Sequence, residues 1–114
     1  MIINHPEHKQ ASTFYIYNKF DSGNEVIYMY SYSTRVIEIE LVHIDGVKQF
    51  ARLTCHGLYS RTTIKHISWF ARRYLDDLDY YNIKASFISD KSLRLSVTAY
   101  ERITQRLIND CNNQ

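Results

Sequence analysis

A cysteine followed by a histidine, Cys55-His56, is the first arrangement in the sequence that could do chemistry. A thiol activated by an imidazole is a nucleophile of covalent catalysis. On a β-strand, however, neighbouring side chains point to opposite faces of the sheet. Cys55 alternates in step with Leu53, so we expect its thiol to be buried and inert. The pair therefore does not predict a nucleophilic site.

Two carboxylates, Glu38 and Glu40, share one face of a predicted strand, as paired carboxylates do in acid–base catalysis. Arg52 across the sheet and Lys48 nearby explain them more simply as a solvated ladder of opposite charges. The five histidines show no ligand spacing with the two cysteines, so no metal site is predicted. We expect a protein that is not an enzyme and that needs no cofactor.

Cations gather around the start of the clearest predicted helix. The hydroxyl of Thr62 stands between Arg61 and Lys65, at the positive end of the helix dipole. A helix start of this kind can hold a phosphate or an acidic side chain. The simpler interpretation, which we favour, is that serine and threonine hydroxyls cap the helix here. With Arg72 farther along, these residues are the candidate contacts to an anion or a nucleic acid.

A line of aromatic and charged residues is expected on the outer side of that helix. Trp69, Arg73, Asp76 and Tyr80 fall almost opposite its apolar stripe. Exposed tryptophan, tyrosine and arginine are the residues that anchor protein interfaces. An isolated tryptophan rarely stays in water. Either a partner or another part of the chain must therefore bury Trp69, and the sequence leaves both alternatives open.

Tyrosine is the compositional outlier, with 10 copies in the chain. Tyr28 and Tyr30 share one face of a predicted strand, and a four-residue turn sets Tyr17 opposite Tyr28 and Tyr15 opposite Tyr30. A sheet face that carries aromatic rings can stack nucleic-acid bases. It can also pack against a partner or a second copy. The alternative is that the rings only stabilise the sheet as cross-strand pairs.

The sheet that positions these residues is expected to consist of hairpins within residues 13–55. In the second hairpin, a two-residue Asp45-Gly46 turn would set Ile39 against Arg52 and mix the apolar and charged faces. A slip of one residue turns every side chain to the other face. We therefore expect a loop one residue longer, with a left-handed glycine, which sets Ile39 against Ala51.

Helical spacing of apolar residues predicts one long helix over residues 60–81, lying across the inner face of the sheet. Its apolar stripe consists of Ile64, Ile67, Ala71, Tyr74, Leu75, Leu78 and Tyr81. Residues 83–97 alternate around a Ser-Asp-Lys turn and predict a third, shorter hairpin. Thr98 and Glu101 have the spacing of a capping box and predict a final helix that begins there. Its inward residues are Tyr100, Ile103, Leu107 and Cys111.

The length of 114 residues fits one α+β domain over residues 13–114, preceded by a flexible arm over residues 1–12. Its sheet of two to three hairpins is packed by one long helix and a C-terminal helix. The net charge of +2 is too small for general attraction to nucleic acid or membranes. No stretch resembles a membrane span or a signal peptide. Two cysteines favour reduced thiols, so we expect a cytoplasmic protein.

Two short motifs resemble those of a family of small uncharacterised proteins encoded by phages and mobile elements, mainly of Gram-positive bacteria. Residues 30–34 read Tyr-Ser-Tyr-Ser-Thr, and residues 59–66 read Tyr-Ser-Arg-Thr-Thr-Ile-Lys-His. The resemblance covers about residues 28–73. It implies a phage or mobile-element origin, but the family has no established activity that could identify functional residues here.

These observations predict a non-enzymatic phage protein that acts by stoichiometric contact with a host protein or protein–nucleic-acid complex. Its most concrete form is an anti-defence inhibitor, for instance of a CRISPR nuclease, with Trp69, Arg73 and Tyr80 as contacts. The alternative is a small nucleic-acid-binding accessory protein that uses Arg61 and Lys65. A third hypothesis is a self-associating homodimer. No contact with membranes is expected.

Overall fold

The computed structural model describes residues 2–4, 14–21, 24–31, 34–56, 61–75, 80–88 and 92–112 of the chain. Its strands are β1 (Ile2–Asn4), β2 (Phe14–Asp21), β3 (Asn24–Ser31), β4 (Thr34–Ile44), β5 (Val47–Cys55) and β6 (Leu93–Leu95). Its helices are α1 (Arg61–Tyr74), α2 (Tyr80–Ile88) and α3 (Val97–Asn112). The α+β class predicted from the sequence is confirmed. All six strands form one antiparallel sheet in the order β1-β2-β3-β4-β5-β6.

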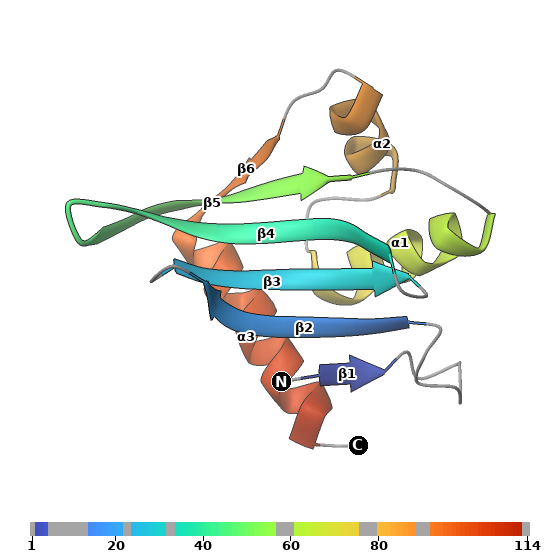
Figure 1. Ribbon diagram of the computed structural model, residues 1–114, viewed down its shortest axis with the longest axis horizontal. Helices are drawn as coiled ribbons and strands as arrows, with labels where there is room; N and C mark the ends of the chain where they lie inside the picture. The colour runs from blue at the N-terminus through green and yellow to red at the C-terminus, as the bar shows by residue number, and fades with distance from the viewer. Residues whose placement is uncertain are drawn as a thin grey trace.

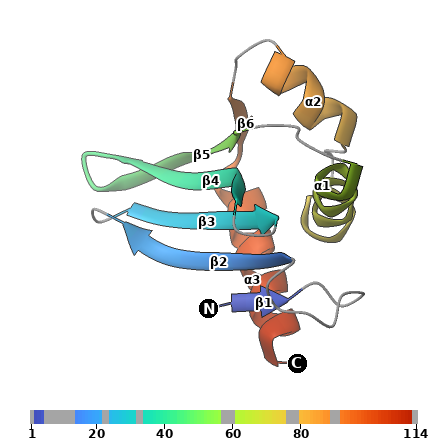
Figure 2. The same ribbon diagram turned by 45° about the vertical axis from the view of Figure 1, so that its right-hand side comes forward.

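The three helices lie on the same side of this sheet, and α3 crosses the strands (Figures 1 and 2). The core lies between the sheet and the helices, because alternate residues of the strands turn their apolar side chains that way. Fully buried strand residues include Ile27, Met29, Ile37, Ile39, Leu41, Ala51 and Leu53. The helices contribute Ile67, Phe70, Tyr74, Ile83, Tyr100, Ile103 and Leu107. None of the described helices lies on the opposite face of the sheet, which we call the helix-free face.

The first hairpin has the predicted register. Tyr15 pairs with Tyr30, and Tyr17 pairs with Tyr28. Their pairing places these residues at matching positions on one face, since the side-chain period of a strand is two. The expected flexible arm is wrong for its first residues, because β1 (Ile2–Asn4) pairs with β2. The remainder of that arm, Met1 and residues 5–12, falls outside the described residues.

The predicted register of the second hairpin is wrong. Ile44 pairs with Val47, so the turn consists of Asp45 and Gly46 alone, both with positive φ (54° and 79°). A bulge between Val42 and His43 then shifts the register by one residue. Turn and bulge together keep apolar residues against apolar residues, as Ile39 against Leu53. The predicted three-residue loop would also have set apolar residues against apolar residues. The structure reaches the same result with a two-residue turn, because the bulge supplies the extra residue that this shorter turn lacks.

The long helix predicted over residues 60–81 is two helices. The chain leaves α1 after Tyr74, where Arg106 of α3 donates a hydrogen bond to the Tyr74 backbone carbonyl (3.2 Å). Such a contact satisfies a carbonyl that continued helix would have used. Leu75 is buried as predicted, but Tyr81 is 75 % exposed and does not belong to the apolar stripe.

Residues 83–97 do not form the predicted hairpin. The first half is helix, since α2 continues to Ile88, and only β6 (Leu93–Leu95) is strand, paired with the edge of β5. The helix α3 begins at Val97, one residue before the predicted capping box. Ser96 is its N-cap, because its hydroxyl accepts a hydrogen bond from the Ala99 backbone N–H (3.0 Å).

Candidate functional site

A buried polar cluster fastens the first half of α1 to the end of β3. The Ser31 hydroxyl lies 3.1 Å from Thr63 Oγ1 and 2.8 Å from His66 Nδ1. All three side chains are buried. The cluster joins the two sequence motifs at residues 30–34 and 59–66, which are far apart in the chain. Thr63 therefore takes part in the contact between α1 and β3. The side of α1 opposite Thr63 faces outward.

A second cluster fastens the end of α1 to α3. Arg73 donates two hydrogen bonds to Asp110, Nε to Oδ2 (3.0 Å) and Nη2 to Oδ1 (2.6 Å), and the Tyr74 hydroxyl donates to Oδ2 (2.5 Å). The Arg73 guanidinium, helped by Tyr74 and opposed by burial, holds the pKa of Asp110 below its ordinary value. Burial, reinforced by the bond to Asp110, raises the pKa of Tyr74. Arg73 is thus engaged within the molecule.

The outward side of α1 carries a basic stripe, which we define as Arg61, Lys65 and Arg72. All three residues are exposed, and the 14-residue helix contains neither aspartate nor glutamate. Spacings of four and seven residues leave their directions within about 40° of one another around the helix axis. None of the three forms an ion pair with another described residue. The side chain of Thr62, the fourth predicted anion contact, is outside the described part of the chain.

The predicted outward line of Trp69, Arg73, Asp76 and Tyr80 does not form as expected. Trp69 is only 9 % exposed and belongs to the core, with its ring edge against Tyr74 (5.8 Å between ring centres, 80° between planes). Of the two alternatives left open by the sequence, burial within the chain is the one found. Asp76 and the side chain of Tyr80 lie outside the described residues. Trp69 therefore cannot anchor a partner.

The helix-free face of the sheet holds the tyrosines predicted as contacts. Tyr28 is only 3 % exposed, whereas Tyr30 is half-buried, and the two rings meet edge to face (6.3 Å). The guanidinium of Arg35 stands over the Tyr28 ring, 3.9 Å from its centre. A side-chain hydrogen bond to Tyr30 raises the pKa of Arg35, so this cation stays charged. The face thus presents an arginine in front of an aromatic ring.

The same arrangement recurs at the other edge of this face. Arg94 of β6 stands over the Phe50 ring of β5, 3.9 Å from its centre, and Arg52 approaches it at 5.7 Å. Our sequence reasoning missed these contacts. The signal for Arg94 was present, since it alternates with Leu93 and Leu95 and must point away from them. No local pattern shows that its strand would join the edge of β5.

The carboxylates Glu38 and Glu40 of the helix-free face each have a side-chain partner. His56 Nε2 lies 3.3 Å from Glu38 Oε2, and Arg52 Nη1 lies 4.0 Å from Glu40 Oε1. Cys55 packs against the core on the other side of the sheet. The predicted separation of Cys55 from His56 is thereby confirmed. Among the described residues, no three histidine, cysteine, aspartate or glutamate side chains are grouped as metal ligands would be.

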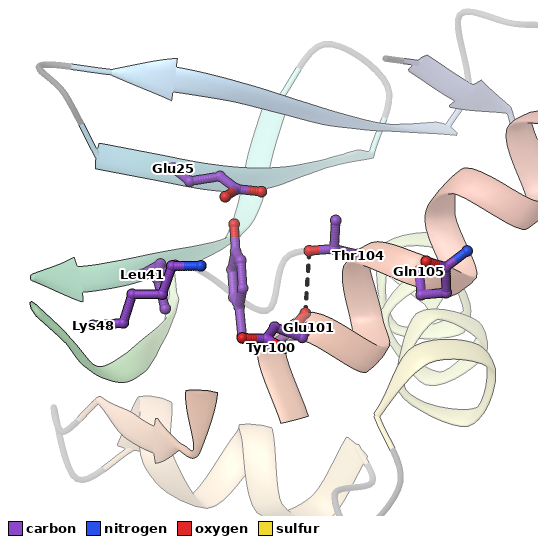
Figure 3. A pocket seen from close by; sticks show the side chains of 7 residues that line it. All are labelled: Glu25, Leu41, Lys48, Tyr100, Glu101, Thr104 and Gln105. Atoms are coloured by element: carbon purple, nitrogen blue, oxygen red, sulfur yellow. Dashed lines mark hydrogen bonds between the residues drawn. The ribbon is translucent and has the colours of Figure 1, made fainter. Parts of the chain in front are cut away.

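A small hollow of about 110 Å³ lies between the sheet and α3. Figure 3 shows the Tyr100 ring reaching from α3 toward Glu25 at the start of β3, with Lys48 and Glu101 at the sides. Two carboxylates against one ammonium group make this hollow unfavourable for a phosphate. It also lies at the end of the strands away from α1 (Figure 1). The hollow is therefore separate from the basic stripe.

Comparison with known proteins found no relative of this chain. No family model, no curated protein and no solved structure matches this chain. Within the described part of the chain, no helix is both long and apolar enough to span a membrane.

Proposed function

We propose that this protein is a small nucleic-acid-binding accessory protein that performs no reaction of its own. The observation that carries the proposal is the basic stripe, Arg61, Lys65 and Arg72, on the exposed side of a helix without acidic residues. Phosphate contacts from lysine and arginine supply most of the affinity of proteins for nucleic acid, whatever the sequence. The stripe spans about 16 Å along the helix axis, enough to meet several phosphates of one strand.

The electrostatic support is local. The whole chain has a net charge of only +2, but the stripe concentrates three positive charges on one helix side. The neighbouring Arg73 is neutralised by Asp110 and adds little. A ligand that spreads negative charge over a comparable length matches this pattern better than a single carboxylate does. A polyanion is therefore the ligand class favoured by the charge distribution.

The other hypothesis is an anti-defence protein that binds a host protein through Trp69 and Tyr80. Its main predicted contact, Trp69, is not at the surface. Trp69 is part of the core, and Arg73 is bonded to Asp110. The resemblance of residues 30–34 and 59–66 to proteins of phages and mobile elements supports an accessory role during phage growth. We place that role in the cytoplasm of the host cell, where the nucleic acids of a phage are copied and read.

The test is a gel-shift titration of the full-length protein with nucleic acid over a range of salt concentrations. We expect the double variant Lys65→Ala/Arg72→Ala to bind far more weakly and to lower the slope of log affinity against log salt by about 2. The matched control is Lys48→Ala/Lys84→Ala, which removes the same charge from exposed positions outside α1. Equal binding by both variants, or no binding by the wild type at low salt, would refute the proposal.

A further inference from the structure

The helix-free face presents guanidinium groups in place of bare aromatic rings. Arg35 covers Tyr28, which is only 3 % exposed, and Arg94 covers Phe50 at the same distance of 3.9 Å. Both arginines are themselves exposed. Each ring thus lies close to its guanidinium group and fixes the position of that group on the sheet. The rings therefore hold the two cations in place for a further partner.

A planar cation backed by an aromatic ring suits one kind of ligand well. Bases of single-stranded nucleic acid stack on arginine planes as well as on aromatic side chains. Duplex nucleic acid cannot do so, because its bases are already stacked on one another. A lysine, whose ammonium is a point charge, would attract phosphate equally but would offer no plane for stacking. The chemistry of this face thus distinguishes single strands from duplexes.

The charges of this face do not prevent such binding. Its carboxylates, Glu38 and Glu40, each have a side-chain partner, the imidazole of His56 at 3.3 Å and the guanidinium of Arg52 at 4.0 Å. They lie between the two aromatic-backed arginines on the strands. Along β4 and then across to β6, Arg35 and Arg94 are separated by roughly 20 Å, from strand rise and strand spacing. Bases would accordingly stack near the ends of the face, with Glu38, the cross-strand partner of Tyr28, next to one of them.

At one end of the sheet, the end of β3 and the start of β4 lie beside α1, whose outward side carries the basic stripe. Ser31, at the end of β3, is bonded to Thr63 and His66 of α1, and Arg35 follows at the start of β4. Figure 1 shows α1 beside this end of the sheet. A strand whose phosphates follow the stripe would reach Arg35 on turning around that end. No other described helix lies in its path across the face.

We propose that the helix-free face binds single-stranded nucleic acid by stacking two of its bases on Arg35 and Arg94. This inference rests on the proposed nucleic-acid binding and specifies its ligand as single-stranded. The basic stripe supplies attraction to phosphates, and the two arginine–aromatic pairs supply the preference for unpaired bases. Sequence discrimination is weak in this arrangement, because every base has a face that can stack.

The test is fluorescence anisotropy with a labelled single-stranded oligonucleotide and with the duplex of the same sequence. The double variant Arg35→Lys/Arg94→Lys keeps both positive charges and loses both planar guanidinium groups. We expect it to bind the single strand about tenfold more weakly or worse, with an unchanged salt slope and unchanged binding of the duplex. The matched control, Lys48→Arg/Lys84→Arg, exchanges the same two kinds of cation at exposed positions outside the stripe and the arginine–aromatic pairs, so it should bind both ligands like the wild type.

A second measurement avoids any change to the protein. An abasic strand of equal length keeps its phosphates but offers no bases, so it should bind as weakly to the wild type as the normal strand binds to the Arg35→Lys/Arg94→Lys variant. Equal affinity for abasic and normal strands would overturn the stacking inference. If Lys65→Ala/Arg72→Ala still weakens binding in that case, the proposed function stands. Absence of any binding by the wild type would refute both.

Discussion

At the scale of single residues, Asp110 is the side chain whose chemistry the structure defines most sharply. Its carboxylate accepts hydrogen bonds from Arg73 and Tyr74, and these bonds hold its pKa below the ordinary value. A carboxylate stabilised in this way favours the folded state as long as it is ionised. Its contribution is thus present above the unfolded pKa of about 3.9 and is lost as the pH falls through the lowered folded value.

We expect Asp110→Asn to lower the free energy of unfolding by about 1–2 kcal/mol at pH 7, since charge-assisted bonds are lost at a partly exposed site. Urea denaturation at pH 7 and at pH 3 measures the effect. The difference between wild type and variant should shrink at the lower pH. Glu101→Gln on the same helix is the control and should change little, since Glu101 is exposed. A difference that stays constant with pH would contradict the assignment.

At the scale of elements, the turn and the bulge of the second hairpin together set the register of β4 against β5. Asp45 and Gly46 both adopt left-handed backbone conformations, which suit a two-residue turn between twisted strands. The bulge that follows restores apolar pairing, so that Leu41 meets Ala51 in the core. The residue types of the turn could be recognised in the sequence, but the bulge could not, because no local pattern marks it.

Gly46→Ala should lower the free energy of unfolding by about 1 kcal/mol, because a β-carbon disfavours the left-handed region. No side-chain clash contributes, since a β-carbon built there meets no atom within 4 Å. Asp45→Asn is the matched change, and it should be neutral, as asparagine tolerates this conformation. Thermal unfolding of both variants is the measurement. An unaffected Gly46→Ala variant would mean that the turn differs from the one described.

At the scale of the whole molecule, the three described helices cover one face of the six-stranded sheet, and none of them lies on the other face. This division explains why the tryptophan expected on the surface is inside. The core needs apolar area from α1 on more than one helix side, because α1 meets both the sheet and α3. Trp69 therefore stabilises the fold, whereas Arg61, Lys65 and Arg72 of α1 are exposed.

Trp69→Ala should lower the free energy of unfolding by about 3–5 kcal/mol through loss of buried area and the cavity that remains. Tyr81→Ala is a large-to-small change at a position 75 % exposed and should cost far less. Chemical denaturation followed by circular dichroism compares the two variants. A Trp69→Ala protein as stable as the wild type would show that the indole lies at the surface after all.

The sequence by itself determined the fold class, the strand alternation, the register of the first hairpin and the cations of α1. These features depend on periods of two or 3.6 residues and on turn residues, which are read within a few positions of one another. Only the tertiary structure decided where α1 ends, whether Trp69 is buried and which rings the arginines cover. The carbonyl of Tyr74 is satisfied by Arg106, and Phe50 is covered by Arg94. Such contacts join residues more than thirty positions apart, and no local period records them.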